Sequence, residues 1–242
     1  MESRDAAMLM ALDEACMEAV RDGVAPPTVR LYRWLPSAIT LGNFQCYADE
    51  IDANAVAVAG IPVVRRQTGG GAVYHDAAGE VTYSIIAPLV LFPLGVSESS
   101  AAICGVLVDA LAELGLHAEF RPINDITING RKISGNAQTR RGGVLLQHGT
   151  ILLTVDAATM FAFLTPDKSK LSDKPFIKSV NAAVTSLAEH GVTDRDAIEH
   201  AIRESFRRRY SGDAGVWTPR ELARAEELVR EKYSADEWNK MR

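Results

Sequence analysis

The chain has 242 residues, of which 47% are hydrophobic and 24% are charged, with 18 Gly and 10 Pro. This composition excludes a disordered or fibrous chain and is typical of a globular protein, which we expect to be one domain over residues 1–242. A formal net charge of −5 argues against nucleic acid or an anionic membrane as a partner. Three cysteines are too few and too scattered for a disulfide framework or a paired zinc site.

No segment has the pattern of a membrane span or of a secretory leader. The longest apolar run, residues 83–96, is interrupted by Pro88 and Pro93 and is shorter than the roughly 20 residues that a transmembrane helix needs. The first residues are acidic and lead into an amphipathic pattern, whereas a signal peptide begins with basic residues. We therefore expect a cytoplasmic protein in a reducing compartment.

The first half of the chain is expected to combine two helices with several short strands. Apolar residues recur every three or four positions over residues 3–22 and again over 97–115, which predicts a helix in each segment. Between them, segments rich in Val, Ile, Thr and aromatic residues predict strands at 28–34, 38–41, 61–67 and 81–87.

A β-hairpin is expected around Asn129-Gly130, a dipeptide that favours two-residue turns, with strands at 125–128 and 131–138. After a turn at 141–143, a further strand follows at 144–154. This register places Lys132 just beyond the tight turn and opposite residues near Asp125, while Ile126, Ile128 and Ile133 are buried on one face. Without the glycine-rich segment described below, the better interpretation of this pair is an exposed ion pair across a hairpin, which contributes at most about 1 kcal/mol.

The last third is expected to be helical at 157–164, 180–189, 194–210 and 219–233. The final helix has a strong start, with Thr218 as cap, Pro219 in the first position and Glu221 able to complete a capping box. The predicted fold is α/β (α+β), with a mixed, largely antiparallel sheet flanked by helices.

The segment richest in candidate functional residues is Arg-Arg-Gln-Thr-Gly-Gly-Gly-Ala-Val-Tyr-His-Asp, residues 65–76. Three glycines after a strand leave backbone N–H groups open to a ligand, and the two arginines add positive charge. The segment is not a P-loop, because no Gly-Lys-Ser/Thr follows, and G-x-G-x-x-G is absent too. On its own it fits a glycine-rich turn with solvated arginines equally well. A second candidate, His148 at the start of an apolar strand, is more often a packed residue than a catalyst, and we treat it as a pocket wall.

Three motifs in order resemble lipoate–protein ligases of the biotin/lipoate ligase superfamily: residues 65–76, then Asn124-Asp125 with Gly130-Arg131-Lys132-x-x-Gly135-x-Ala137, then His148-Gly149-Thr150. The resemblance extends to residues 30–34, 42–45 and 232–238 and so covers nearly the whole chain. It implies the ligase catalytic-domain fold and a reaction in two steps. Lipoate attacks ATP, with Mg²⁺, to give lipoyl-AMP and pyrophosphate, and a lysine of an acceptor lipoyl domain then takes the lipoyl group. The acceptor would be of the 2-oxoacid dehydrogenase E2 or glycine cleavage H protein type.

The resemblance also implies roles for individual residues. Lys132 is expected to contact the lipoyl carbonyl oxygen and the phosphate, with Arg66 as a second cation, because catalysis here is mostly positioning and charge neutralisation. Asp125 is expected either to orient Lys132 or to help hold Mg²⁺. The expected ATP-binding residues are Arg66, Gly71, Ala72, Val73, Tyr74, Asn124 and Lys132. The expected lipoate-binding residues are Gly70, Lys132, His75, Gly135, Ala137 and His148.

Several alternatives stay open. An octanoyl- or lipoyl-transferase of the same fold needs no ATP and holds the acyl group on a cysteine, which one branch carries shortly before the Gly-Arg-Lys hairpin and another after the His-Gly segment. Residues 115–130 contain no cysteine, and none occurs beyond Cys104. Biotin ligase is a weaker alternative, because the triple-glycine segment resembles the lipoate branch. A non-catalytic module that binds lipoylated partners or nucleotide would not need both Lys132 and Arg66.

Two further expectations concern partners. Two-domain members of the family carry an additional C-terminal domain, and this sequence ends at Arg242, soon after the 232–238 motif. We therefore expect a separate accessory subunit in adenylate formation; the alternative is a catalytic domain that suffices alone or that transfers a preformed adenylate. The segment 166–178, with four lysines, is expected to be a flap over the nucleotide or a docking strip for an acidic lipoyl domain, although a solvated loop explains any single lysine.

Overall fold

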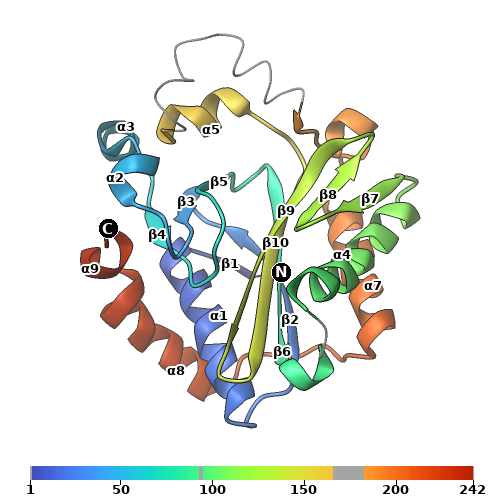
Figure 1. Cartoon of the computed structure of the whole chain (residues 1–242), viewed down its shortest axis with the longest axis horizontal. Helices are drawn as coiled ribbons and strands as arrows, with labels where there is room; N and C mark the ends of the chain where they lie inside the picture. The colour runs from blue at the N-terminus through green and yellow to red at the C-terminus, as the bar shows by residue number, and fades with distance from the viewer. Residues whose placement is uncertain (1, 93–94, 166–182, 242) are drawn as a thin grey trace.

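The computed structural model describes residues 2–92, 95–165 and 183–241, which form two β-sheets and the helices around them (Figure 1). The larger sheet has seven strands in the order β1-β2-β6-β10-β9-β8-β7, and the smaller has three in the order β4-β3-β5. All neighbouring strands are antiparallel except the pairs β1–β2 and β3–β4. The expected mixed, largely antiparallel sheet flanked by helices is confirmed.

The strands are β1 Glu2–Arg4, β2 Thr28–Trp34, β3 Ala38–Leu41, β4 Val63–Arg65, β5 Val73–His75, β6 Glu80–Pro88, β7 Ala118–Arg121, β8 Asp125–Ile128, β9 Arg131–Arg141 and β10 Val144–Leu152. The α-helices are α1 Ala6–Arg21, α2 Tyr47–Glu50, α3 Ala53–Ala59, α4 Val96–Glu113, α5 Ala157–Phe163, α7 Arg195–Tyr210, α8 Pro219–Leu228 and α9 Asp236–Asn239. Two 3-10 turns, Leu89–Leu91 and Ala188–His190, and a π-helical turn, Val229–Tyr233, complete the described elements. No described helix has both the length and the apolar character that crossing a membrane requires.

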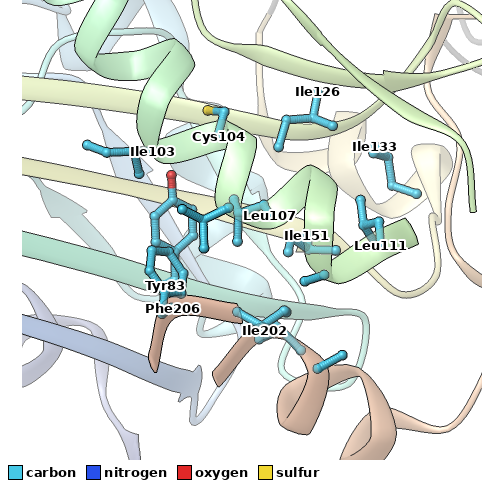
Figure 2. Packing of buried hydrophobic residues seen from close by; sticks show 14 of the residues in the cluster. Tyr83, Ile103, Cys104, Leu107, Leu111, Ile126, Ile133, Ile151, Ile202 and Phe206 are labelled. Atoms are coloured by element: carbon cyan, nitrogen blue, oxygen red, sulfur yellow. The ribbon is translucent and has the colours of Figure 1, made fainter. Parts of the chain in front are cut away.

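One face of the large sheet is covered by α4 and α7 (Figures 1 and 2). Alternate strand residues point into this layer and meet apolar side chains of the two helices, each of which contributes about 1.5–3 kcal/mol when fully buried. The residues labelled in Figure 2 are Tyr83, Ile103, Cys104, Leu107, Leu111, Ile126, Ile133, Ile151, Ile202 and Phe206.

The opposite face of the large sheet is covered by α1, which packs in turn against α8 (Figure 1). Leu9 and Leu12 of α1 are fully buried against Tyr32 of β2 and Leu228 of α8. Val64 of the small sheet belongs to the same cluster. The small sheet therefore lies on the α1 side, and the loop between β4 and β5 reaches the large sheet from that side.

The hairpin prediction is confirmed. Asn129 and Gly130 have φ of 51° and 76°, the left-handed values that this two-residue turn requires. Ile126, Ile128 and Ile133 are buried, as expected. The ladder contains an irregularity at Ile133, because Ile126 pairs with Ser134 while Thr127 pairs with Lys132.

The predicted start of the first helix is wrong. The helix begins at Ala6, where the Asp5 side chain accepts a hydrogen bond from the Met8 N–H at 2.9 Å. Residues 2–4 form β1 instead, which pairs in parallel with β2. The capping box at the start of α8 is confirmed, with Thr218 and Glu221 satisfying each other's backbone N–H groups.

The helix predicted at 180–189 is wrong from Val184 onward, although Ala183 is helical. Val184 forms a β-bridge with Lys132, and Ala188–His190 form a helical turn of the 3-10 type. Residues 180–182 lie outside the described residues, as does the lysine-rich segment 166–178. The strand predicted at 61–67 is reduced to β4, and the sequence prediction missed β5, β7 and the short helices α2, α3 and α9.

Candidate active site

Lys132 lies on the α1 side of the large sheet, near the start of β9. Its Nζ is 2.6 Å from Oδ1 of Asp125 on the neighbouring strand β8. A Cβ atom at Gly135 would lie 2.8 Å from both Nζ and Cε of Lys132. The Lys132 side chain therefore lies directly over the β9 backbone at Gly135, in a space that only glycine leaves free. The predicted pair of acid and base on neighbouring strands is therefore present.

The loop between β4 and β5, residues 66–72 and hereafter the glycine loop, approaches the same strand. A Cβ atom at Gly70 would lie 4.0 Å from Cβ of Ala137, and one at Gly42 would lie only 2.0 Å from the Gly70 carbonyl oxygen. Gly135 and Ala137 are two residues apart on β9 and so share a face, separated by about 7 Å. Lys132 and the glycine loop thus border one patch of the sheet.

The carbonyl groups of the glycine loop are turned inward onto Arg66. The Arg66 Nη2 donates to the Gly69 oxygen at 2.7 Å and to the Gly71 oxygen at 2.8 Å. Since C=O and N–H point in opposite directions across a trans peptide, the N–H groups of Gly70 and Ala72 point away from Arg66. Within the described parts of the chain, no group accepts a hydrogen bond from the N–H of Gly70, Gly71 or Ala72. Such N–H groups can bind an anionic oxygen.

Both arginines at the end of β4 are buried, so the alternative of solvated arginines is wrong. Arg65 is 0% exposed, and its guanidinium donates to backbone oxygens of Gly42, Gln45, Trp238, Asn239 and Met241. Arg66 is 5% exposed, and burial lowers its pKa to about 10. Arg65 therefore ties the C-terminal helix to the small sheet, while Arg66 shapes the glycine loop.

Asp125 lies between two cations. While Oδ1 faces Lys132, Oδ2 accepts a hydrogen bond from Nη2 of Arg121 at 2.8 Å. Among the two roles that the sequence left open for Asp125, these contacts favour orientation of Lys132. The described residues contain no group of three or more His, Cys, Asp or Glu side chains that could hold a metal ion. A direct contact of Asp125 with Mg²⁺ stays a prediction.

The remaining residues predicted to bind nucleotide surround the glycine loop or support β9. Asn124 exchanges side-chain and backbone hydrogen bonds with Asn136, which fixes the approach of β8 to β9. Val73 and Tyr74 belong to β5, and the Tyr74 ring stacks on Phe163 with centroids 5.7 Å apart. Ala72 and Tyr74 pack against the small apolar cluster of the same sheet. Their contact with a nucleotide stays a prediction.

The two histidines predicted to bind lipoate are buried, and both ring nitrogens of each have partners. His75 lies between Thr40 at 2.9 Å and Glu80 at 2.7 Å and stacks on the Trp34 ring. The Nε2 of His148 lies 2.7 Å from the Thr68 hydroxyl, and its Nδ1 lies 3.2 Å from Asp13. Burial lowers the pKa of His148, although Asp13 opposes this shift. A contact of either ring with lipoate stays a prediction and would involve ring carbon atoms.

Asp13 is a member of this site that the sequence analysis missed. Its carboxylate is 2% exposed and binds Arg30, Ser84 and His148. Burial acts to raise the pKa of Asp13, but Arg30, with His148 and Ser84, holds it below its ordinary value. One signal in the sequence was available, because Asp13 interrupts the apolar face of α1 one turn after Leu9.

Two of the three cysteines, Cys16 and Cys104, differ from a thiolate nucleophile in their surroundings. Cys16 on α1 and Cys104 on α4 are fully buried, and burial raises the pKa of each thiol to about 12. Cys104 also lies on the opposite side of the sheet from Lys132, within the α4 and α7 layer (Figure 2). Cys46 is half-buried at the start of α2. Reactive cysteines have lowered pKa values and partial exposure, which Cys16 and Cys104 lack.

Comparison with known proteins supports the resemblance. The family model for the lipoyl protein ligase A/B catalytic domain matches residues 5–207. A curated relative, octanoyltransferase LipM of Kyrpidia tusciae, is 36% identical, and the alignment covers 97% of this chain and 94% of the relative. The bipartite lipoate protein ligase of Thermoplasma acidophilum has a TM-score of 0.87 at 28% identity and covers 100% of this chain and 96% of that chain. A lipoate-protein ligase A bound with ATP has a TM-score of 0.84 at 27% identity, with 99% of each chain covered. The chain therefore belongs to the lipoyl protein ligase A/B catalytic domain family and is an enzyme of that family.

Proposed function

We propose that this enzyme transfers an octanoyl or lipoyl group to a lysine of a lipoyl domain. The observation that carries this proposal is the position of Lys132, which Asp125 holds over Gly135 on the face of β9 that the glycine loop also borders. Attack on an acyl carbonyl places negative charge on its oxygen, and fixed positive groups stabilise that charge. The ammonium group of Lys132 and the unpaired N–H groups of the glycine loop are such groups.

We further propose that the acyl group is activated by ATP. In the first step a carboxylate oxygen of the acid bonds to the α-phosphorus and pyrophosphate leaves. In the second, the amine of the acceptor lysine bonds to the carbonyl carbon and AMP leaves. Two of the three cysteines support this route, because burial raises the pKa of both Cys16 and Cys104 to about 12, whereas a route through an enzyme-bound thioester at either residue needs a reactive thiolate. The structural similarity to a ligase bound with ATP agrees with it.

A second candidate is octanoyl transfer from a thioester without ATP. It is favoured by the curated relatives, which are named octanoyltransferase LipM and match over nearly the full chain. In this candidate Lys132 still faces the acyl carbonyl, but the donor's thiol leaves in place of AMP. The missing cysteine before the Gly-Arg-Lys hairpin counts against the covalent form of this route.

One experiment separates the two candidates. An acceptor lipoyl domain, of the kind described with the Thermoplasma ligase, is incubated with the enzyme and analysed by mass spectrometry. One reaction contains free octanoate or lipoate, ATP and Mg²⁺, and the other contains an octanoyl thioester of a carrier protein without ATP. A mass gain only in the first supports ATP activation, and a gain only in the second overturns it in favour of the transferase. Each reaction is repeated with a candidate accessory subunit, and no mass gain in any of them contradicts both candidates.

A further inference from the structure

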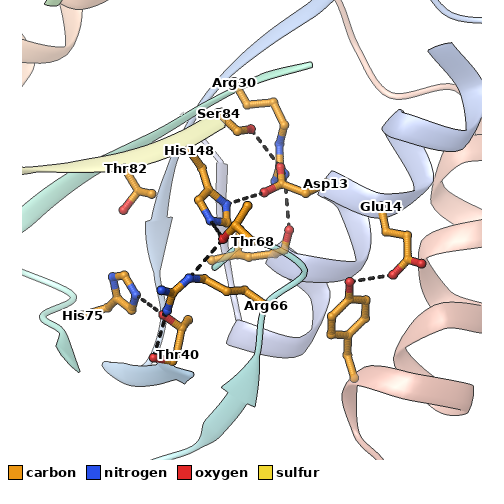
Figure 3. A network of polar contacts seen from close by, with 12 residues as sticks. Asp13, Glu14, Arg30, Thr40, Arg66, Thr68, His75, Thr82, Ser84 and His148 are labelled. Carbon is orange, nitrogen blue, oxygen red and sulfur yellow. Dashed lines mark hydrogen bonds and ion pairs between the residues drawn. The ribbon is translucent and has the colours of Figure 1, made fainter. Parts of the chain in front are cut away.

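Arg66 is buried without a carboxylate in contact among the residues that the structure describes, and neutral acceptors surround its guanidinium (Figure 3). Its Nε donates to the Thr68 hydroxyl at 3.1 Å, and its Nη1 donates to the Thr40 hydroxyl at 3.0 Å. The Nη2 group holds the two glycine-loop carbonyls described above. A buried charge is costly unless nearby groups compensate it, so the partners of the two hydroxyls matter.

Each of these threonine hydroxyls also contacts the Nε2 atom of a buried histidine. The Thr68 hydroxyl lies 2.7 Å from Nε2 of His148, and the Thr40 hydroxyl lies 2.9 Å from Nε2 of His75. The Nδ1 of each ring faces a carboxylate, which can only accept, so a neutral ring has its proton at Nδ1 and accepts the threonine proton at Nε2. A histidine that accepts at Nε2 carries its proton at Nδ1. The Nδ1 of His148 then donates to Asp13, and that of His75 donates to Glu80. Two chains of the same order, threonine to histidine to carboxylate, thus converge on one guanidinium.

The two carboxylates are themselves held in place by other elements. Asp13, on α1, binds Arg30 of β2 and accepts from the Ser84 hydroxyl of β6 at 2.8 Å. Glu80, at the start of β6, is 3% exposed and accepts a second hydrogen bond from Thr82 at 2.9 Å. The ends of both chains are therefore anchored in the large sheet and α1, while Arg66 and the glycine loop belong to the small sheet.

We propose that Asp13 and Glu80 are positioning residues for the glycine loop. Each acts through its histidine and threonine on Arg66, whose contacts with Gly69 and Gly71 set the direction of the loop N–H groups. Asp13 and Glu80 are 2% and 3% exposed and lie behind their histidines, which is why we place them as positioning residues and not in contact with substrate. The kinetic part of the proposal rests on the proposed function, in which the loop binds the activated acyl group or its phosphate, whereas the hydrogen-bond directions do not depend on it.

The directions are tested by ¹⁵N NMR of the full chain with labelled histidine. We expect the neutral rings of both His148 and His75 to be protonated at Nδ1 and unprotonated at Nε2. A neutral ring of either residue protonated at Nε2 would overturn the proposal. This measurement needs no substrate, so its outcome is independent of which acyl-transfer reaction the enzyme catalyses.

The kinetic consequence is tested by comparing two buried carboxylates. Glu80→Gln removes the charge at the end of one chain, and Glu199→Gln removes a carboxylate of equal burial, 3% exposed, that pairs with Arg33 instead. We expect Glu80→Gln to raise KM for the substrate bound by the loop about tenfold, with a smaller change in kcat, because one charge-assisted hydrogen bond is weakened. Glu199→Gln should leave KM unchanged at a similar loss of thermal stability. Equal changes in KM for both variants would show a merely structural role and overturn the proposal.

A second pair of variants tests the hydroxyl link itself. Thr68→Val has nearly the same shape but cannot bridge Arg66 and His148, whereas Thr68→Ser keeps the hydroxyl. We expect the valine variant to raise KM about as much as Glu80→Gln and the serine variant to recover most of that loss. If both variants have the same KM, the chain through Thr68 does not position the loop. An enzyme without acyl-transfer activity in any assay would contradict the proposed function but leave the NMR result to decide the network.

Discussion

At the scale of single residues, the ammonium group of Lys132 is the charge that the proposed chemistry needs most. Lys132→Ala removes it, and by analogy with the loss of one oxyanion donor we expect a barrier about 3 kcal/mol higher and a rate about a hundredfold lower. The side chain is 36% exposed, so the fold should remain intact. The measurement is the initial rate of acyl transfer to a lipoyl domain, together with ATP–pyrophosphate exchange.

The control for this variant is Lys240→Ala, because Lys240 is an exposed lysine that also pairs with an aspartate, Asp236. We expect wild-type rates for it. Normal acyl transfer by Lys132→Ala would contradict the role given to this residue.

Substitution by alanine is expected to affect activity at one glycine of the central strands and stability at another. At Gly135 a Cβ atom meets only the far end of the Lys132 side chain, at 2.8 Å, so the side chain can move and the fold is kept. Gly135→Ala should lower the acyl-transfer rate about tenfold, a change of about 1.4 kcal/mol, with little change in stability. At Gly149 a Cβ atom would lie 2.0 Å from Oδ1 of Asn136, a buried side chain held by the Tyr83 hydroxyl. Gly149→Ala should therefore lower the free energy of unfolding by about 1–3 kcal/mol.

Urea unfolding and the transfer assay together measure both effects. If Gly135→Ala unfolds as easily as Gly149→Ala, then β9 tolerates no side chain at Gly135, and the contact with Lys132 is not the reason for glycine there.

At the scale of elements, Arg65 holds α9 against the small sheet. Arg65→Met leaves the backbone oxygens of Gln45, Asn239 and Met241 without their guanidinium donor. Each unsatisfied group costs about 1–3 kcal/mol, so we expect a loss of at least about 3 kcal/mol in the free energy of unfolding. Trp238, whose Nε1 donates to the Arg65 oxygen at 2.8 Å, should become more exposed, and its fluorescence emission should shift to longer wavelength.

The comparison variant is Arg224→Met, which removes a partly exposed arginine paired with Glu18 and Glu227. Surface pairs of this kind contribute up to about 1 kcal/mol. A loss for Arg65→Met no larger than for Arg224→Met would show that α9 docks without the guanidinium.

The elements that could be predicted are those fixed by local chemistry. The turn at Asn129-Gly130 and the cap at Thr218 depend on neighbours in the sequence, and both are present in the structure. The strand β1 was missed because residues 2–4 are assigned by pairing with β2, about 30 positions away in the sequence. The predicted helix 180–189 does not continue beyond Ala183 for the same reason, since Val184 pairs with Lys132 instead of continuing a helical turn.

In the candidate site, too, contacts between neighbours in the sequence could be predicted, and contacts between distant segments could not. Asp125 and Lys132 could be placed together from the hairpin register, because the turn between them is short. The contact of Asp13 with His148 joins α1 to β10 across 135 positions, and no local pattern specifies it. Nor could the inward turn of Arg66 be predicted, because a charged side chain after a strand is more often exposed.

At the scale of the whole molecule, the buried His148 predicts a loss of stability on mild acidification. Burial lowers the pKa of His148 below its ordinary value of 6.5, although Asp13 opposes the shift. The unfolded chain therefore takes up this proton more readily than the folded one. The neutral ring contributes its full stability when the pH is above the pKa of His148 in the unfolded chain. This contribution is lost as the pH falls from that value toward the lower pKa of His148 in the folded chain. Asp13, whose pKa lies below its ordinary value of 3.8, adds a separate loss only in more acidic solution.

We expect the free energy of unfolding, measured with urea from about pH 8 to about pH 5, to fall with a slope of at most about 1.4 kcal/mol per pH unit for this one proton. In His148→Gln the free energy of unfolding should change less with pH between neutral pH and the more acidic range in which Asp13 titrates. The reason is that the titrating group is gone while a polar side chain remains. His200→Gln, at an exposed position of α7, should keep the wild-type slope. If His148→Gln keeps the wild-type slope as well, the proton uptake belongs to another group, and the neutral His148 that joins Thr68 to Asp13 does not govern the acid stability of the fold.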